Sequence, residues 1–169
     1  LYIREKVLGE KHPSTAIIYN NLALLYQDQG NYEEALTYYQ KALNIQEKVL
    51  KENHPDTGVT YHNLALLYQA QGKYEEALKD IEVFIERFPT RSYGYSMRGS
   101  LKEQMGDRDG ALEDYNEGIS MNPDYAYLYL RRGKLYSQMD INDLAEQDFQ
   151  KLIQIDTTVK SSSCRNYGL

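Results

Sequence analysis

NLALLYQDQGNYEEAL, which runs from Asn21 to Leu36, returns as NLALLYQAQGKYEEAL from Asn63 to Leu78, with fourteen of its sixteen letters unchanged. Fainter copies follow downstream, and two positions that always hold a small residue mark all four. The first marker stands at Ala23, Ala65, Gly99 and Gly133, and the second at Ala35, Ala77, Ala111 and Ala145. Both markers advance by 42, 34 and 34 residues, so the chain contains four repeats in one register.

Each repeat has the pattern of two amphipathic helices joined by a short turn. Apolar residues recur every three or four positions on both sides of Gly30, as expected for helices with one buried face. Before the glycine they are Tyr19, Leu22, Ala23 and Tyr26, and after it Tyr32, Ala35, Leu36, Tyr39 and Ala42. The sequence therefore predicts a helix, a turn and a second helix in every repeat.

The turn between the two helices requires a residue that tolerates a left-handed backbone. Gly30, Gly72 and Gly106 occupy this position, and glycine adopts the conformation without a Cβ clash. Asp140 replaces glycine in the fourth repeat, and aspartate is among the few other residues that tolerate it. Acidic pairs such as Glu33 and Glu34 follow the turn, where carboxylates suit the positive end of the second helix.

The small residues explain why the pattern is repeated. Two helices approach closely only where one side chain is small, so we expect Ala23 and Ala35 to face each other, with Tyr26 and Tyr39 filling the space around them. One such helix pair cannot bury its apolar face alone, and stacked neighbours must supply the core.

The two periods have a local cause. Phe88 is followed at once by Pro89, which disfavours helix in the residue before it, so we expect the second helix of repeat 2 to end about two turns earlier than that of repeat 1. The predicted organisation is a single array: the end of a preceding repeat (1–12), four repeats (13–53, 54–89, 90–123 and 124–157), and a truncated start of the next helix or a frayed tail (158–169).

Composition limits the class of protein. With 41% hydrophobic residues, 26% charged residues and four prolines, the chain should fold. It has neither the roughly 20-residue apolar run of a membrane helix nor the apolar core of a signal peptide, so we expect no membrane partner. A net charge of −6 disfavours nucleic acid. The single cysteine, Cys164, allows no internal disulfide, and we expect a cytoplasmic protein.

These motifs resemble the tetratricopeptide repeat. The first two repeats, with LALLYxxxGxYEEAL and HPxT linkers, are similar to the 42-residue type of kinesin light chains, and the last two to the ordinary 34-residue type. Repeat 3 departs from the pattern at Lys102 and Arg108, where the earlier repeats hold tyrosine. The resemblance implies an all-α, right-handed superhelical solenoid of antiparallel helix pairs, whose first helices line a concave groove that binds peptides or partner helices.

Carried over residue by residue, the resemblance implies a groove that crosses all four repeats. Its residues are Asn20, Asn21, Leu24 and Gln27; His62, Asn63, Leu66 and Gln69; Tyr93, Ser96, Met97, Ser100 and Glu103; and Tyr127, Leu130, Arg131 and Lys134. Members that grip a chaperone's terminal carboxylate need lysines and an arginine in the groove. Because Asn20, Tyr93 and Met97 stand at those places, we expect no such clamp.

Two features of the groove each have two interpretations. Asn21 and Asn63, one period apart, could bond the backbone of an extended ligand, since an amide both donates and accepts, or they could bond only neighbouring helices and water. Arg131 and Lys134 could favour an acidic ligand segment, or they could be solvated surface charges.

Nothing in the sequence predicts an enzyme, a metal site or a cofactor. His12 and His54 recur in linkers, and His62 has no second ligand at metal-binding spacing. Gly-rich phosphate loops and nucleophile elbows are absent from the sequence.

We therefore expect a module that binds a protein or peptide partner in its groove. The alternatives are an assembly scaffold that joins subunits through its end helices, and a recruiting or sensing region of a larger multidomain protein. Because the chain starts without methionine and within a repeat, we expect it to be a fragment.

Overall fold

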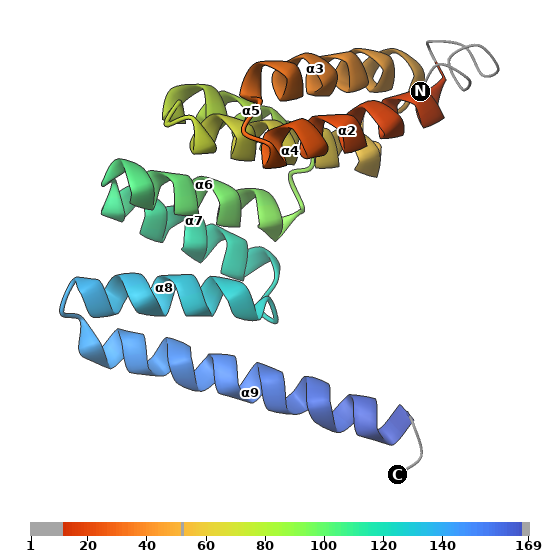
Figure 1. Cartoon of the computed structure of the whole chain (residues 1–169). Coiled ribbons are helices and arrows are strands. Elements are labelled where there is room, and N and C mark those ends of the chain that lie inside the picture. The colour runs from red at the N-terminus through yellow and green to blue at the C-terminus, as the bar shows by residue number, and fades with distance from the viewer. Residues whose placement is uncertain (1–11, 52, 167–169) are drawn as a thin grey trace. The chain divides into compact units, whose positions relative to one another are not determined.

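The structure is a computed structural model that describes residues 12–51 and 53–166 (Figure 1). These residues form eight α-helices and no strand, in two compact units, residues 1–89 and 90–169. Unit 1 contains α2 (Pro13–Asp28), α3 (Tyr32–Val49), α4 (Pro55–Ala70) and α5 (Tyr74–Arg87), and unit 2 contains α6 (Ser92–Met105), α7 (Arg108–Met121), α8 (Ala126–Gln138) and α9 (Asn142–Asn166). The predicted all-α fold of helix pairs is confirmed.

The helices pair as the repeats predict. In unit 1, α2 packs on α3 and α4 on α5, and in unit 2, α6 packs on α7 and α8 on α9. We call the leading member of each pair a first helix and the other a second helix. The two units meet in the sequence where repeats 2 and 3 do, after Pro89. That all four repeats form one continuous array stays a prediction.

The small residues lie at the centre of each helix pair. Ala23 of α2 and Ala35 of α3 are fully buried in one cluster with Tyr39, and Leu64 and Leu67 of α4 complete it. Burying a side chain as large as Tyr39 stabilises the fold by roughly 2 to 3 kcal/mol. Its hydroxyl donates to Gln27 Oε1 at 3.1 Å, so this core tyrosine also reaches the end of α2. The predicted approach of Ala23 and Ala35 is confirmed.

Unit 2 holds glycine where unit 1 holds the first alanine. A Cβ on Gly99 would lie 2.6 Å from the ring of the fully buried Tyr115, and one on Gly133 would lie 2.9 Å from Phe149. Aromatic rings of the second helices therefore fill the space that the alanine methyl group takes in unit 1.

The turns have the predicted conformation. Gly30, Gly72 and Gly106 have φ angles of 77°, 71° and 86°, and Asp140 has a φ of 60°. The acidic residues after the first two turns lie in the first turns of α3 and α5, as predicted.

Replacing Gly72 by alanine should reduce the free energy of unfolding by roughly 1 kcal/mol, because a Cβ is strained at this φ although it meets no other atom within 4 Å. Gly72→Asn should lose less, since asparagine tolerates the conformation. Urea unfolding followed by circular dichroism measures both, and equal losses would contradict this explanation.

The difference between the two repeat lengths is spread over three places. α3 has 18 residues and α5 has 14, so the second helix is longer by one turn and not by the predicted two. The connection 50–54 is one residue longer than 88–91, and α4 starts three residues earlier relative to Ala65 than α6 does relative to Gly99. Pro55 at the first position of α4 accounts for this early start, because proline suits the first turn of a helix.

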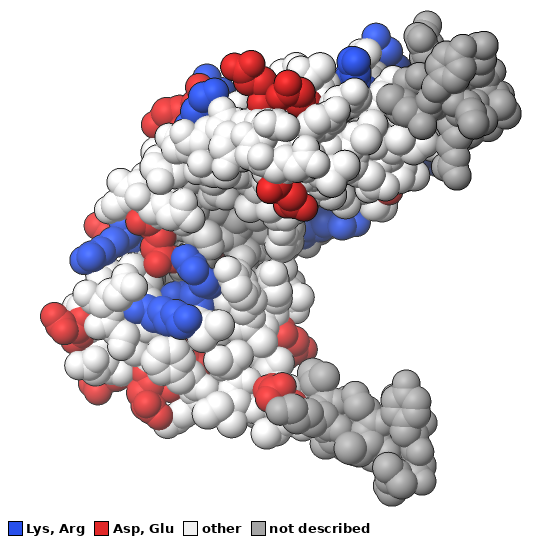
Figure 2. All heavy atoms as spheres, viewed as in Figure 1, with Lys and Arg blue, Asp and Glu red and all other residues white. Residues whose placement is uncertain are grey.

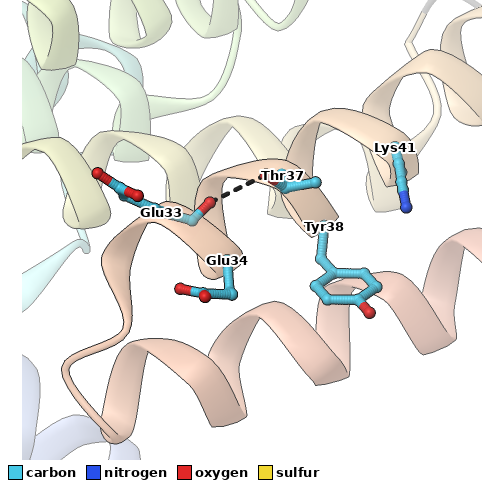
Figure 3. Close-up of a pocket in the computed structure, with 5 residues that line it drawn as sticks. All are labelled: Glu33, Glu34, Thr37, Tyr38 and Lys41. Atoms are coloured by element: carbon cyan, nitrogen blue, oxygen red, sulfur yellow. Dashed lines mark hydrogen bonds between the residues drawn. The ribbon is translucent and has the colours of Figure 1, made fainter.

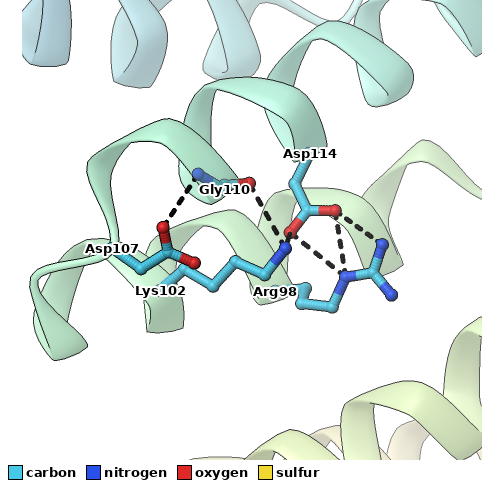
Figure 4. A network of polar contacts seen from close by, with 5 residues as sticks. All are labelled: Arg98, Lys102, Asp107, Gly110 and Asp114. Atoms are coloured by element: carbon cyan, nitrogen blue, oxygen red, sulfur yellow. Dashed lines mark hydrogen bonds and ion pairs between the residues drawn. The ribbon is translucent and has the colours of Figure 1, made fainter.

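Two buried ion pairs stand one period apart in unit 2. Arg98 of α6 binds Asp114 of α7 at 2.6 Å, with Lys102 at 2.9 Å from the same carboxylate, as Figure 4 shows. Arg132 of α8 binds Asp148 of α9 through two hydrogen bonds, of 2.9 and 2.7 Å. Each pair joins a first helix to its second helix across the centre of a repeat.

Repeat 2 keeps the aspartate of this pair and lacks the arginine. Asp80 of α5 lies 34 residues before Asp114, but the position that corresponds to Arg98 holds the buried Leu64. The Oδ2 atom of Asp80 is buried and has no hydrogen-bond partner among the described residues. Burial raises the pKa of Asp80 to about 6. Asp80 is therefore a carboxyl group without the counter-ion that its equivalents have.

The ends of the chain differ from the prediction in one respect. Residues 158–166 continue α9 instead of starting a new helix, because no proline or glycine interrupts the segment as Pro89 and Pro123 do after α5 and α7. The predicted end of a preceding repeat lies outside the described residues, apart from His12, which caps α2.

Candidate functional site

Within each unit, the first helices present exposed apolar side chains at equivalent positions of the repeats. Four equivalent positions near the starts of these helices carry large apolar side chains that are between 37% and 53% exposed. They are Ile17, Val59, Tyr93 and Tyr127. Two turns further along, the same face holds Leu24 and Leu66, which are 40% and 41% exposed.

In unit 1 these residues form what we call the apolar stripe: Ile17 and Leu24 of α2, and Val59 and Leu66 of α4. The two helices contact each other, so the two halves of the stripe are neighbours. At 3.6 residues per turn, Ile17, Asn21 and Leu24 lie within about 60° of the helix surface. The exposed Asn21 therefore stands between two apolar side chains, where it could bond a ligand backbone.

Three of the predicted groove residues lie below the surface. Asn20, Asn63 and Ser96 are all less than 9% exposed, so the exposed face is narrower than the sequence predicts. Asn20 is one residue, and hence about 100°, away from Asn21 and points toward α4. Its Nδ2 donates to Thr60 Oγ1 at 2.7 Å, and Thr60 in turn donates to Gln46 of α3 at 2.7 Å.

The asparagine pair is therefore unequal. Asn21 is exposed on α2, whereas its equivalent on α4, Asn63, is buried. Gln27 accepts the hydroxyl of Tyr39, and Gln69 is half-buried at the corresponding place on α4. His62 is also half-buried, and burial lowers its pKa, so it is a neutral side chain at pH 7.

The first-helix face of unit 2 is aromatic and charged instead of aliphatic. Tyr93 and Tyr127 replace the β-branched residues of unit 1, and Met97 is half-buried beside them on α6. Burial, followed by the nearby Tyr125 and Tyr127, raises the pKa of Tyr93 to about 12. The Tyr93 phenol is therefore a protonated hydrogen-bond donor at neutral pH.

Arg131 is held by a network across three helices. Its guanidinium binds Glu103 of α6 at 2.7 Å, and the hydroxyl of Tyr115 of α7 donates to the same carboxylate at 2.5 Å. The Glu103 carboxylate thus compensates the charge of Arg131, so this arginine is neither the open anion site nor the solvated charge that the sequence suggested. Lys134 is exposed one turn along α8.

A shallow hollow lies on α3, away from the predicted groove residues. Figure 3 shows its lining, Glu33, Glu34, Thr37, Tyr38 and Lys41, around a volume of about 330 Å³. The ammonium group of Lys41 lies 5.1 Å from the ring centre of Tyr38, and Tyr38 stacks on Tyr26. The Thr37 hydroxyl donates to the backbone carbonyl of Glu33 at 3.0 Å, and the hollow is open to solvent rather than an enclosed cavity for a small ligand.

The linker histidines have a structural role that the sequence did not reveal. Nδ1 of His12 accepts the backbone N–H of Ser14, and Nδ1 of His54 accepts that of Asp56, so each histidine caps a first helix. Within residues 12–51 and 53–166, no group of three or more potential ligands could hold a metal ion. The described part of the chain also contains no helix long and apolar enough to cross a bilayer.

Sequence reasoning missed two residues of this face, Ile17 and Val59. Both belong to the regular apolar pattern and were therefore indistinguishable from core residues. The signal that could have identified them is their register, since they lie 42 residues apart and Tyr93 and Tyr127 continue the series at intervals of 34.

Comparison with known proteins covers most of the chain. Models of the tetratricopeptide repeat match residues 1–48, 14–82 and 126–158, and a TPR repeat model matches residues 99–140. A search of curated proteins found no match.

Several solved structures share the fold. MamA, known from a crystal structure, is 20% identical to this chain, with a TM-score of 0.69. The match covers 92% of this chain and 86% of the MamA chain. BtubC (BKLC) from P. vanneervenii is 20% identical, with a TM-score of 0.74, and the match covers 88% of this chain and 66% of the BtubC chain. A putative kinesin light chain from Podosopora anserina with nearly identical TPR-like repeats is 21% identical and covers 94% and 82%, with a TM-score of 0.72.

Proposed function

The chain belongs to the tetratricopeptide repeat family, and from this premise we propose that it binds an extended segment of a partner protein on its first-helix face. Repeats of this family generally serve as protein–protein interaction modules. The observation that carries the proposal is the apolar stripe of unit 1, four large apolar side chains that are 40% to 53% exposed on one face. Exposed apolar residues gathered on one face are typical of interaction sites.

The polar groups beside the stripe fit an extended ligand. Asn21 lies between Ile17 and Leu24, and its amide can donate to and accept from a peptide backbone while the apolar neighbours receive side chains. On the face of unit 2, Tyr93 and Tyr127 offer rings and hydroxyl donors. Such a face would bind its ligand by burying apolar side chains and by hydrogen bonds to the ligand backbone.

Replacing Leu24 and Leu66 together by serine should weaken partner binding about tenfold or more, because burying the exposed two fifths of each leucine contributes roughly 1 kcal/mol to a complex. The measurement is quantitative capture of partner proteins from native lysate by the wild type and the variant. Asn21→Ala should cause a smaller loss, of about threefold, since it removes one hydrogen bond.

The matched control removes two equally exposed apolar side chains elsewhere. Leu144 and Ile153 of α9 are 39% and 62% exposed, and their replacement by serine should leave partner capture unchanged. If the control variant loses the same partners, or if the Leu24 and Leu66 variant keeps them while circular dichroism shows it folded, the proposal is wrong.

A second function, assembly through an end helix, is favoured by one observation. Ile153 of α9 has 62% exposure, whereas the equivalent Ile119 of α7 is packed against the core of unit 2. An assembly scaffold predicts concentration-dependent oligomers by light scattering that disappear in the Leu144 and Ile153 variant and persist in the Leu24 and Leu66 variant.

A further inference from the structure

The first helices of unit 1 carry no positive residue. α2 has the sequence PSTAIIYNNLALLYQD and α4 has PDTGVTYHNLALLYQA, and their only charged side chains are Asp28 and Asp56. In the space-filling view the surface over α2 is largely white (Figure 2). Of the six lysines and arginines that the structure describes elsewhere in unit 1, four lie on the second helices α3 and α5, for example Lys48 and Arg87 in their last turns. The other two are Lys51, in the connection between α3 and α4, and Lys73, in the turn before α5.

Both carboxylates belong to the surface of the apolar stripe. Asp28 lies 11 residues after Ile17, which at 3.6 residues per turn places it within about 20° of that side chain on α2. Asp56 lies three residues before Val59, on the same side of α4. Asp28 is exposed and the Asp56 side chain is 42% exposed, so a ligand on the stripe can reach both.

The two carboxylates lie at opposite ends of the stripe. Asp28 is the last residue of α2, and Asp56 is in the first turn of α4. At the end where Asp28 lies, the carbonyl ends of α2 and α4 add partial negative charge, and neither helix has a basic residue in its last turn.

Burial is the main cause of two raised tyrosine pKa values in unit 1, and nearby carboxylates add to both. The pKa of Tyr39 is raised to about 12, first by burial and then by Asp28. The pKa of Tyr68 is also raised, first by burial and then by Asp80 and Glu76. A positive group nearby would lower both values, and none contributes to either shift.

We propose that the apolar stripe of unit 1 takes a basic partner segment, in which lysine or arginine residues flank apolar side chains. Its apolar residues would cover Ile17, Leu24, Val59 and Leu66, and its positive ends would meet Asp28 and Asp56. This inference rests on the proposed function and adds the charge of the ligand. The alternative of an acidic ligand, which the sequence raised for Arg131 and Lys134, does not extend to this unit.

Three fluorescein-labelled synthetic peptides with amidated C-termini test the inference: KSLSLSLSK, ESLSLSLSE and QSLSLSLSQ. Their alternating leucines present one apolar edge when extended, and only the charge of the ends differs. Fluorescence anisotropy with the full chain should give a dissociation constant about tenfold lower for the lysine peptide than for the glutamate peptide at about 50 mM salt. The ratio should fall to about twofold at about 0.5 M salt, because salt screens exposed charges.

Variants that remove carboxylate charges test whether Asp28 and Asp56 cause the preference for the lysine peptide. Asp28→Asn with Asp56→Asn should bring the lysine-to-glutamate ratio close to one and leave the glutamine peptide unaffected. The matched control is Asp109→Asn with Asp143→Asn, which removes the same charge from exposed first-turn positions of α7 and α9 and should leave the ratio unchanged. Circular dichroism verifies that each variant is folded.

The outcomes separate this inference from the proposed function. If the glutamate peptide binds as tightly as the lysine peptide, or if the preference survives the Asp28 and Asp56 change, the basic ligand is wrong even where Leu24→Ser with Leu66→Ser abolishes binding of the glutamine peptide. If no peptide binds, or if binding survives those serines, the proposed function fails and this inference fails with it. Dimers detected by light scattering that disappear in the Leu24→Ser with Leu66→Ser variant would identify a second copy as the occupant and overturn the inference.

Discussion

Replacing Arg132 by leucine should lower the free energy of unfolding of unit 2 by about 3 to 5 kcal/mol. The change leaves the carboxylate of Asp148, whose side chain is 5% exposed, without the two hydrogen bonds that compensate its charge. The loss exceeds that of an exposed ion pair because the uncompensated charge stays in the interior. Urea unfolding followed by circular dichroism measures it.

The control is the double variant Arg132→Leu with Asp148→Leu. It removes both charges, fills the space with apolar groups and should recover most of the lost stability, since such replacements are often close to neutral. A single variant that unfolds within 1 kcal/mol of the wild type would show that water reaches Asp148 and would contradict the prediction.

Asp80 should make the stability of unit 1 fall as pH rises. Its folded pKa, about 6, lies above the ordinary value of 3.8, so the folded state binds the proton more tightly than the unfolded state does. The carboxyl contribution is therefore fully present below pH 3.8 and lost as pH rises through 6. The shift corresponds to about 3 kcal/mol, which we reduce to about 2 kcal/mol because the side chain is partly exposed and solvent screens it.

The comparison of Asp80→Asn with the wild type isolates this effect from other carboxyl groups. The variant should match the wild type near pH 4 and exceed its free energy of unfolding by about 2 kcal/mol at pH 7.5. A difference between variant and wild type that does not change with pH would refute the assignment.

The fold was predictable because it depends on residue types that each favour one particular local structure. Gly30, Gly72 and Gly106 mark left-handed turns, and the small residues at Ala23 and Ala35 mark the close approach of helices. Each of these residue types recurs at the repeat period, so the assignment made in one repeat could be checked in the others. The end of α9 was not predictable in the same way, because Ser161 to Arg165 neither favour nor forbid helix and only the absence of a breaking residue decides.

The candidate site was predictable only in outline. The sequence placed Leu24, Leu66, Tyr93 and Tyr127 on the first helices, where they are exposed. It could not separate Asn20 from Asn21, because adjacent residues differ by about 100° and the helix rotation depends on packing against α3 and α4. The pairs Arg98–Asp114 and Arg132–Asp148 also went unnoticed, since a charge on a helix normally suggests solvent and only the structure shows these carboxylates buried.

The spacing inside each helix pair has a consequence for recombining the repeats. The interval from the first small residue to the second is 12 in all four, as from Ala23 to Ala35 and from Gly133 to Ala145. The length differences fall after the second small residue, in the end of the second helix, the connection and the start of the next first helix. Chimaeras joined at the glycine turns would mismatch buried partners such as Arg98 and Asp114, while crossovers in the connections 50–54 and 88–91 would transplant intact hairpins. The connections are therefore the natural splice points for building longer or reordered arrays from this chain.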